Sequence, residues 1–374
     1  MPADTQTDTQ PDTEGAAAER VRLLASQHAA DADRTRKLAP EVVEAIREAG
    51  FARHFVAARW NGTEGTFAEL TRAVTTVGEG CPATAWCASL SAYSARFAAH
   101  LPEEGHRALW GEGPDVVVAT ALMPAGRAAA VDGGWRLSGQ WNYVSGIDFA
   151  DWALVCAAVP GGDGPPRLRF FALPWGTYTV RETWDSVGMR ATGSHTLAVD
   201  GLFVPDHLTF DRTDMLTGRN GTSRVDAHNV PFQAVGGLTF IAPVVGAAAG
   251  ALNAAVDVLT GKRRTHSTEL HLTRAGAMID AARCLVAQNA EVIDERRFTP
   301  ELMARNERNA TFAAELAVEA VGLLVAAGGS SGFGEGLALQ RYWRDVNAAA
   351  SHVALKYDTA ARKNYAAALL GPEA

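Results

Sequence analysis

The pattern of apolar residues changes character twice along this 374-residue chain, and these two changes limit the possible folds more than any other feature. Residues 111–205 contain short runs of β-branched and aromatic residues with Gly, Pro and Asp between them, which is typical of antiparallel strands with one buried face. Residues 16–110 and 231–374, on either side, carry apolar residues at helical spacing. The sequence therefore predicts an α+β fold, mainly α, in which an antiparallel β-domain separates an N-terminal helical domain from a C-terminal bundle.

Two stretches fit neither pattern. Residues 1–15 are polar and acidic and contain no aromatic residue, so we predict a disordered tail there. Residues 206–230 are polar and irregular, and we interpret them as a linker or as a lid over a site. The helical segments that follow lie near residues 232–260, 268–297, 300–327 and 338–370. Long helices joined by short loops predict a four-helix bundle.

Charge and cysteine usage narrow the setting of the protein. The formal net charge of −8 and the absence of a Lys/Arg-rich run argue against nucleic-acid binding. The four cysteines are scattered and no signal-peptide pattern opens the chain, so we predict a cytoplasmic protein. Residues 229–255 carry no charge, but their many Ala and Gly residues make them poorly hydrophobic for a membrane span. We therefore predict no membrane, and a helix buried on all sides inside an oligomer.

Two turns rich in Gly and Ser within the β-region are candidates for a ligand site. The first ends a strand at Ser145-Gly146, and in an extended strand Trp141, Tyr143 and Ser145 face the same side. The second, Thr192-Gly193-Ser194, offers hydroxyls and unhindered backbone N–H groups. A planar ligand with a phosphate tail needs both the flat aromatic surface and these polar groups. A small β-domain with core tryptophans and ordinary turns has the same pattern.

These segments resemble a known family. Residues 141–152, which read Trp-x-Tyr-x-Ser-Gly and then Asp-x-Ala-Asp-Trp, resemble the flavin-contacting strand of the acyl-CoA dehydrogenase fold. More narrowly, they resemble the oxygenase components of two-component, reduced-flavin-dependent monooxygenases, above all the hydroxylases of aromatic polyketide biosynthesis. Residues 188–205 and 340–352 resemble two further signatures, in family order. The resemblance implies a three-part fold. We predict that it assembles as a homotetramer, because the uncharged helix and the Ala-rich bundle of an isolated subunit would expose a large apolar patch.

The resemblance also implies cofactors and partners. Reduced FMN, with FAD as the alternative, would come from a separate NAD(P)H:flavin reductase and react with O2 to give a C4a-hydroperoxide that hydroxylates an aromatic, phenolic or polyketide-derived, substrate. No G-x-G-x-x-G opens a helix after a strand, which agrees with electrons arriving from another protein. No metal site is predicted, because His266 and His271 lack the i, i+4 spacing of a helical zinc pair.

Individual residues take roles from this resemblance. Ser145 would bond near the flavin N5 and slow the loss of hydrogen peroxide, with Gly146 beside it and Trp141 and Tyr143 as pocket wall. His352 would draw the proton of the substrate hydroxyl, although a lone His among alanines is also typical of a core residue. The remaining cofactor-binding residues are Thr192, Gly193 and Ser194 at the ring edge and Arg263 and Arg264 at the phosphate. A solvated basic pair is the alternative for the two arginines.

Three alternatives stay open from the sequence. An acyl-CoA dehydrogenase with FAD needs a carboxylate to remove the α-proton of the thioester, and His352-Val353-Ala354 stands where many such enzymes carry a glutamate. Some relatives carry that base on an earlier helix. N-hydroxylation of an amine or amino sugar is the second alternative, and a catalytically silent helical scaffold is the third.

Overall fold

The computed structural model of the protein describes residues 13–162 and 164–371. The predicted disordered tail, residues 1–15, lies outside the described residues except for its last three. Those three are helical, because helix α1 begins at Thr13. The helices are α1 (Thr13–Thr35), α2 (Pro40–Glu48), α3 (Phe67–Gly80), α4 (Pro82–Ala98), α5 (Glu103–Trp110), α6 (Arg212–Thr217), α7 (Phe232–Val235), α8 (Leu238–Leu259), α9 (His266–Asp294), α10 (Pro300–Gly328), α11 (Ala338–Ala349) and α12 (Arg362–Leu370). The strands are β1 (Val118–Val131), β2 (Gly134–Val144), β3 (Trp152–Gly161), β4 (Gly164–Pro174), β5 (Thr179–Arg181), β6 (His195–Pro205) and β7 (Thr209–Asp211).

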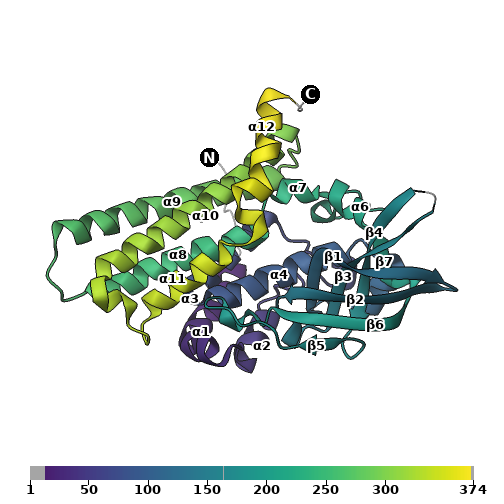
Figure 1. The fold of residues 1–374 in the computed structure, drawn as a ribbon, viewed down its shortest axis with the longest axis horizontal. Helices are drawn as coiled ribbons and strands as arrows, with labels where there is room; N and C mark the ends of the chain where they lie inside the picture. Colours follow the sequence, from purple (N-terminus) through teal and green to yellow (C-terminus); the bar gives the residue numbers. More distant parts are fainter. Residues whose placement is uncertain (1–12, 163, 372–374) are drawn as a thin grey trace, which may run out of the picture.

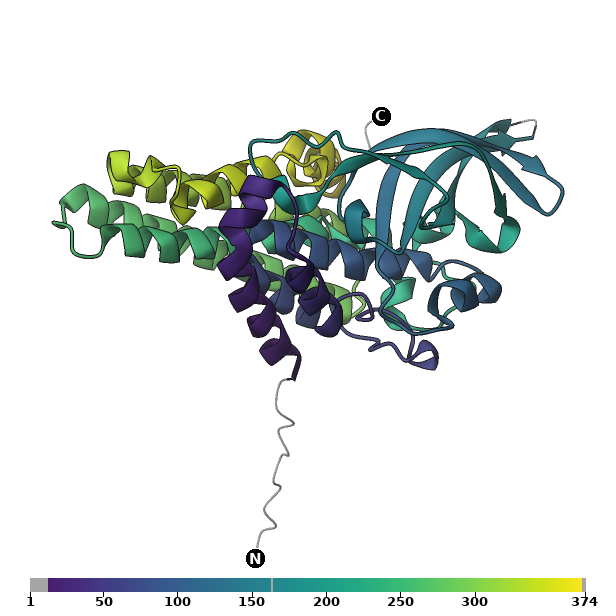
Figure 2. The ribbon, with the colours of Figure 1, turned by 90° about the horizontal axis from the view of Figure 1, so that it is seen from below.

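The order of helices, sheet and bundle is that of the prediction. Figure 1 shows the bundle helices α8 to α11 extending from one side and the sheet at the other end, with α4 between them. Helix α4 is buried along almost its whole length. Its Ser89 hydroxyl donates to the Thr239 carbonyl of α8 at 2.7 Å, and its Ser94 hydroxyl bonds Thr120 of β1 at 2.8 Å. Helix α4 therefore joins all three parts, as the second view also shows (Figure 2).

The sheet is mixed, so the prediction of an antiparallel β-domain is wrong in one pairing. The strand order is β5-β6-β2-β1-β3-β4-β7, and β1 and β3 run parallel. Strands β1 and β2 form an antiparallel hairpin, after which the chain returns to the other side of β1. A third strand placed there must run in the direction of β1. The alternation of apolar residues reports which face is buried, but not the direction of the neighbouring strand.

The fourth bundle helix is shorter than predicted. Helix α11 ends at Ala349, and α12 begins only at Arg362 and stands away from the bundle (Figure 1). Between them the Ser351 hydroxyl donates to the Ala348 carbonyl at 2.6 Å, and His352 Nδ1 accepts the Ala354 N–H at 3.2 Å. Side chains that bond to nearby backbone groups compete with helical hydrogen bonds. The prediction that His352 lies on a continuous last helix is therefore wrong, and His352 is the N-cap of a short 3-10 helix, Val353–Leu355.

The uncharged segment predicted as a buried helix forms α7 and most of α8. Among the residues described, the stretches Phe232–Leu259 and Pro300–Phe333 are long and apolar enough to cross a membrane by length and composition alone. The first is 83% buried within the chain and the second 50%. A core helix passes the same test, so neither stretch by itself indicates a membrane.

Candidate active site

The two Gly/Ser-rich turns predicted as a ligand site lie together. The Gly146 N–H donates to the Thr192 carbonyl at 2.8 Å. The Ser145 and Ser194 hydroxyl oxygens are 2.7 Å apart, and those of Ser194 and Thr192 are 2.6 Å apart. We call Ser145, Ser194 and Thr192 the hydroxyl cluster. Ser194 and Thr192 are 5% and 1% exposed and Ser145 is half-buried, so Ser145 is the member that a ligand can reach.

The strand before the first turn does not present its aromatic residues on one face. Trp141 pairs with Leu197 and Val144 with His195, so β2 carries one residue more than β6 over this interval. Tyr143 lies in that bulge with a left-handed φ of 62°. An extra residue reverses the alternation of side chains beyond it. The predicted shared face of Trp141 and Tyr143 is therefore wrong.

Trp141 belongs to the core of the β-domain. It is 1% exposed, its indole N–H donates to the Cys156 carbonyl at 2.7 Å, and its ring lies against Gly126 and Gly139, where any Cβ would collide with it. This burial leaves no surface of Trp141 for a ligand. Tyr143, in contrast, is 74% exposed at the end of the same strand and contacts the ring of Trp184 edge to face.

Trp86 of α4 links the cluster to His352. Its indole N–H donates to the Ser145 hydroxyl at 3.2 Å, and its ring meets that of His352 edge to face at 5.8 Å between centroids. Phe240 of α8 stacks on His352 at 3.9 Å and on Trp86 at 5.1 Å. Ser145 and His352 come from the β-domain and the C-terminal part, and two aromatic side chains from two different helices bring them into one site.

His352 is a neutral side chain in this apolar setting. Burial lowers its pKa to about 4, because the charged ring would lose its hydration. Its Nδ1 accepts the Ala354 N–H, so the proton of the neutral ring sits on Nε2. Around neutral pH the ring is therefore uncharged.

The second turn is held by two features that the sequence analysis did not identify. Met189 has a left-handed φ of 53°, which is uncommon for a residue with a side chain, and its N–H donates to the Asp345 carboxylate of α11 at 2.6 Å. Asp345 is 4% exposed, and burial raises its pKa to about 6, against the lowering effect of the Met189 N–H bond. Gly188 packs so closely on α11 that a Cβ there would collide with the Arg344 carbonyl.

Gly193 and His195 complete this turn. A Cβ on Gly193 would lie 2.6 Å from an Asp148 oxygen, and its φ of 54° favours glycine as well. His195 Nδ1 accepts the N–H groups of Thr183 and Trp184, so its proton sits on Nε2, 3.6 Å from Asp148. Burial raises the pKa of Asp148, while His195 and Lys37 oppose this shift.

Arg263 and Arg264 do not join the cluster within one chain. Both are exposed in the connection between α8 and α9, at the end of the bundle away from the sheet (Figure 1). Among the described residues neither forms an ion pair within 4.0 Å. Their predicted contact with the phosphate of a cofactor therefore needs a second chain.

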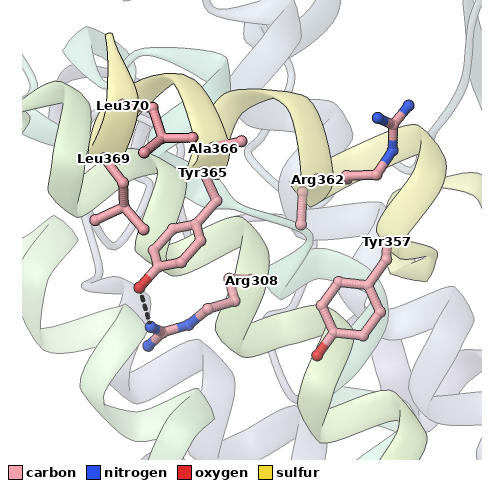
Figure 3. Close-up of a pocket in the computed structure, with 8 residues that line it drawn as sticks. Arg308, Tyr357, Arg362, Tyr365, Ala366, Leu369 and Leu370 are labelled. Atoms are coloured by element: carbon pink, nitrogen blue, oxygen red, sulfur yellow. Dashed lines mark hydrogen bonds between the residues drawn. The ribbon is translucent and has the colours of Figure 1, made fainter.

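A cavity of about 430 Å³ lies apart from the cluster, beside α12. Figure 3 shows Tyr365 of α12 bonded to Arg308 of α10, at 2.6 Å, with Leu369 and Leu370 alongside. No residue predicted for the site lines this cavity.

Sequence reasoning missed Trp86, Phe240, Met189 and Asp345 as parts of the site. Trp86 lies in the predicted N-terminal helical domain and Asp345 in the signature at residues 340–352, but neither pattern predicts which residue it contacts. A single Trp in a buried helix and a single Asp on an amphipathic helix are ordinary core and surface residues by composition. Only their contacts across the three parts of the fold identify them.

The chain is similar to known proteins both in sequence and in fold. A family model described as acyl-CoA dehydrogenase, C-terminal domain, matches residues 238–357. The chain is 29% identical over 366 residues to the FADH(2)-dependent resorcinol hydroxylase, oxygenase component, of Rhizobium sp. strain MTP-10005, covering 90% of this chain and 89% of that protein.

Two solved structures superpose over nearly the whole chain. The 3-HSA hydroxylase from Rhodococcus sp. RHA1 has a TM-score of 0.91 at 26% identity, covering 97% of this chain and 98% of that one. XiaF from Streptomyces sp., in complex with FADH2 and glycerol, has a TM-score of 0.88 at 26% identity, covering 96% and 95%. The similarity therefore extends over the helical parts and the β-domain together.

Proposed function

Because this chain belongs to the oxygenase components of flavin-dependent monooxygenases with an acyl-CoA dehydrogenase-like fold, we propose that it hydroxylates an aromatic, phenolic or polyketide-derived substrate with reduced flavin and O2. The observation that carries the proposal is the joining of the hydroxyl cluster to a neutral histidine through Trp86. A half-buried hydroxyl and an uncharged imidazole in one apolar site are suited to holding a cofactor and accepting a substrate proton.

The residues at the cluster fit a flavin. A flavin has flat apolar faces and a polar edge, and Tyr143 offers an exposed aromatic ring beside the half-buried Ser145 hydroxyl. Gly146 and Gly193 leave the backbone at both turns without side chains. Tyr143, Ser145, Gly146 and Gly193 would hold the ring, with Ser194 and Thr192 supporting Ser145 from behind. FMN is the proposed cofactor and FAD the alternative, since XiaF binds FADH2.

Bound reduced flavin supplies the electrons that activate O2. The chain's own contribution is to place groups around it. Ser145 holds a fixed hydrogen-bonding oxygen where it needs no reorganisation during reaction. Trp86 and Phe240 cover Ser145 and His352 with apolar surface and so keep water away from both.

His352 moves the substrate proton. A phenol has a pKa of about 10 and needs a base to leave its oxygen electron-rich. In the neutral ring Nε2 carries the proton and Nδ1 the free lone pair, so the hydroxyl proton would go to Nδ1, where the Ala354 N–H would give up its bond. The lowered pKa of the ring, about 4, keeps His352 unprotonated and able to act as this acceptor at neutral pH.

The setting proposed for the enzyme follows from the same likeness. A separate NAD(P)H:flavin reductase supplies the reduced flavin by diffusion. The enzyme is a homotetramer, which the Ala-rich bundle and the exposed Arg263–Arg264 loop support, and it works in the cytoplasm, without membrane or nucleic-acid partners, in secondary metabolism. The free cysteines Cys81, Cys87, Cys156 and Cys284 support the cytoplasmic setting.

Rapid mixing tests the activity. The purified chain is mixed without oxygen with reduced FMN, then with O2 and a panel of phenols and amines, and products are identified. Hydroxylated phenols are the expected result. Turnover of amines alone would replace the proposal by N-hydroxylation, and bleaching of tightly bound FAD by an acyl-CoA would replace it by a dehydrogenase.

A further inference from the structure

The turn that carries Thr192 and Ser194 is unfavourable by itself. Met189 adopts the left-handed conformation that residues with a Cβ rarely take, and Gly188 before it fits only because it has no Cβ to meet α11. Such a conformation persists when surrounding structure determines it. The contacts of the Met189 peptide therefore decide whether this turn keeps its shape.

The Met189 carbonyl is the centre of the turn. It accepts the Thr192 N–H at 3.2 Å, the Thr192 hydroxyl at 3.0 Å and the Trp184 indole N–H at 2.9 Å. The orientation of this one carbonyl thus fixes the Thr192 hydroxyl and the Trp184 ring. Trp184 in turn contacts the exposed ring of Tyr143.

Asp345 holds the same residue at its N–H, in the peptide unit before that carbonyl. Its Oδ1 accepts the Met189 N–H at 2.6 Å. The neighbouring Arg344 forms no ion pair with it, because its guanidinium bonds both carboxylate oxygens of Asp33, at 2.8 and 3.2 Å, and it lowers the pKa of Asp345 only from a distance. Among the described residues no cation lies within 4.0 Å of Asp345. A buried carboxylate without a counter-ion is costly, so a role as hydrogen-bond acceptor accounts for its presence better than an ion pair does.

The carbonyl also gives the hydroxyl cluster a direction. A hydroxyl has one proton to donate. Thr192 donates its proton to Met189, so it accepts from Ser194, and Ser194 then accepts from Ser145. Ser145 receives the Trp86 N–H as well. With its proton used inside the cluster, the Ser145 oxygen has a remaining lone pair, which is its free position toward a ligand.

We propose that Asp345 is a positioning residue for the active site. By holding Met189 in its left-handed conformation, Asp345 directs the hydrogen bonds of the hydroxyl cluster. Ser145 then presents an acceptor, rather than a donor, to an N–H group of the bound cofactor. The inference rests on the proposed function for its last step, the facing of Ser145 toward a flavin. The earlier steps concern the chain alone. Asp345 acts through backbone and hydroxyls and touches neither cofactor nor substrate.

Two readouts separate these steps. In the flavin-free protein, amide hydrogen exchange at Met189 reports its bond to Asp345, and in the assay the product formed per reduced flavin reports the orientation of Ser145. In Asp345→Ala we expect exchange at Met189 about tenfold faster or more, the size expected from loss of one bond to a charged group. Coupling should fall less, about twofold to fivefold, because Ser145 senses that loss only through the turn. Asp345→Asn, which keeps an acceptor oxygen, should stay within about twofold of the wild type in both.

Asn347→Ala on the same helix is the control and should change neither readout. If Asp345→Ala does not fold, Asp345→Leu, which fills the volume without an acceptor, takes its place. Unchanged exchange at Met189 in these variants, or its loss in Asp345→Asn, would overturn the proposal. Faster exchange with unchanged coupling, in a protein that Ser145→Ala does uncouple, would overturn the link to Ser145 and leave the proposed function standing. If Ser145→Ala also leaves coupling unchanged, the proposed function fails, and exchange still decides the role of Asp345 in the turn.

Discussion

The hydroxyl cluster lies where α4 meets the two β-domain turns, and the loop that carries Arg263 and Arg264 lies at the end of the bundle away from the sheet; the two regions are completed to different degrees. The cluster lies in the two β-domain turns, which α4 contacts through Trp86 and α11 through Asp345. Each of its hydroxyls has a partner inside the chain. The two arginines are exposed, with no ion pair among the described residues. The hydroxyl cluster is therefore a site with its internal hydrogen bonds already made, whereas the two arginines are exposed cations that no described acidic group neutralises within 4.0 Å.

The difference indicates where a neighbouring chain is needed. Polar contacts to a flavin ring can be built by one chain, because the elements that supply them pack around α4. A phosphate contact from residues at the distal end of the bundle can be made only to a cofactor held by another chain. The following predictions test the two halves separately, from the largest expected effect to the smallest.

Removing the proposed base should have the largest effect. His352→Ala is expected to lower the rate of product formation by about 100-fold or more, the usual contribution of a general base, while reduced flavin still binds. Product formation in single turnovers and flavin affinity by fluorescence measure the two separately. His207→Ala, a partly exposed histidine of the β-domain side, is the control. Loss of folding in His352→Ala would instead favour the core-histidine interpretation.

The pH profile sharpens this test. Burial lowers the pKa of His352 to about 4 from its ordinary 6.5, so the neutral form that accepts a proton persists through mildly acidic pH. Product formation should therefore lose its base only as pH falls toward about 4, rather than through 6.5. The sign for stability is the same: the neutral ring favours the folded state fully above pH 6.5, and this contribution falls as pH decreases toward 4. An acid limb centred at 6.5 would contradict the burial of this ring.

The arginine loop should show the next largest effect. Arg263→Ala with Arg264→Ala is expected to raise the Kd for reduced FMN by about tenfold to 100-fold, because charge-assisted bonds to phosphate are strong. Riboflavin has the same ring and no phosphate, so its Kd should stay unchanged. Arg274→Ala on α9 controls for the loss of an arginine elsewhere in the bundle. Equal weakening of both ligands would show that the loop affects the ring site indirectly.

The proposed role of the arginine loop also requires that the protein assembles into an oligomer. Light scattering at micromolar concentration should give a mass several times 39.5 kDa, because the phosphate contact needs a second chain. A monomer that binds FMN tighter than riboflavin would contradict the placement of the two arginines.

The hydroxyl cluster is tested at Ser145, its half-buried member. Ser145→Ala should lower the product formed per reduced flavin about tenfold, with more hydrogen peroxide released, since a fixed acceptor beside the cofactor is lost. The melting temperature should change little, because one hydroxyl is removed. Ser26→Ala, on the exposed side of α1, controls for loss of a serine. Unchanged coupling would return Ser145 to a structural role in the turn.

Some features of the fold and of the site could be predicted from the sequence, and others could not. The order of the three parts followed from periodicity and composition. The two turns were singled out by their Gly and Ser content, and the family likeness gave their residues roles. The shared face of Trp141 and Tyr143 did not hold, because a bulge of one residue leaves no mark in the sequence and still reverses the side chains. His352 fell outside the helix for a similar reason: the local bonds of Ser351 and His352 outweigh a helical pattern.

Trp86 and Asp345 could not be identified without coordinates, since each acts on residues more than 50 positions away in the chain. Composition gives the burial of such a residue and not its partner. The arginine loop is the extreme case, because its proposed partner is a cofactor held by another chain.

The smallest effect should come from Trp86→Phe, and it tests whether the cluster acts as one unit. Phenylalanine keeps an aromatic ring against Phe240 and His352 but removes the N–H that Ser145 accepts at 3.2 Å. A net hydrogen bond contributes about 0.5 to 1.5 kcal/mol, so coupling should fall about twofold to fivefold, less than in Ser145→Ala. The double variant should couple no worse than Ser145→Ala, because residues of one network are not additive. If the two losses simply multiply, Trp86 acts through packing against His352, and Ser145 keeps its orientation without it.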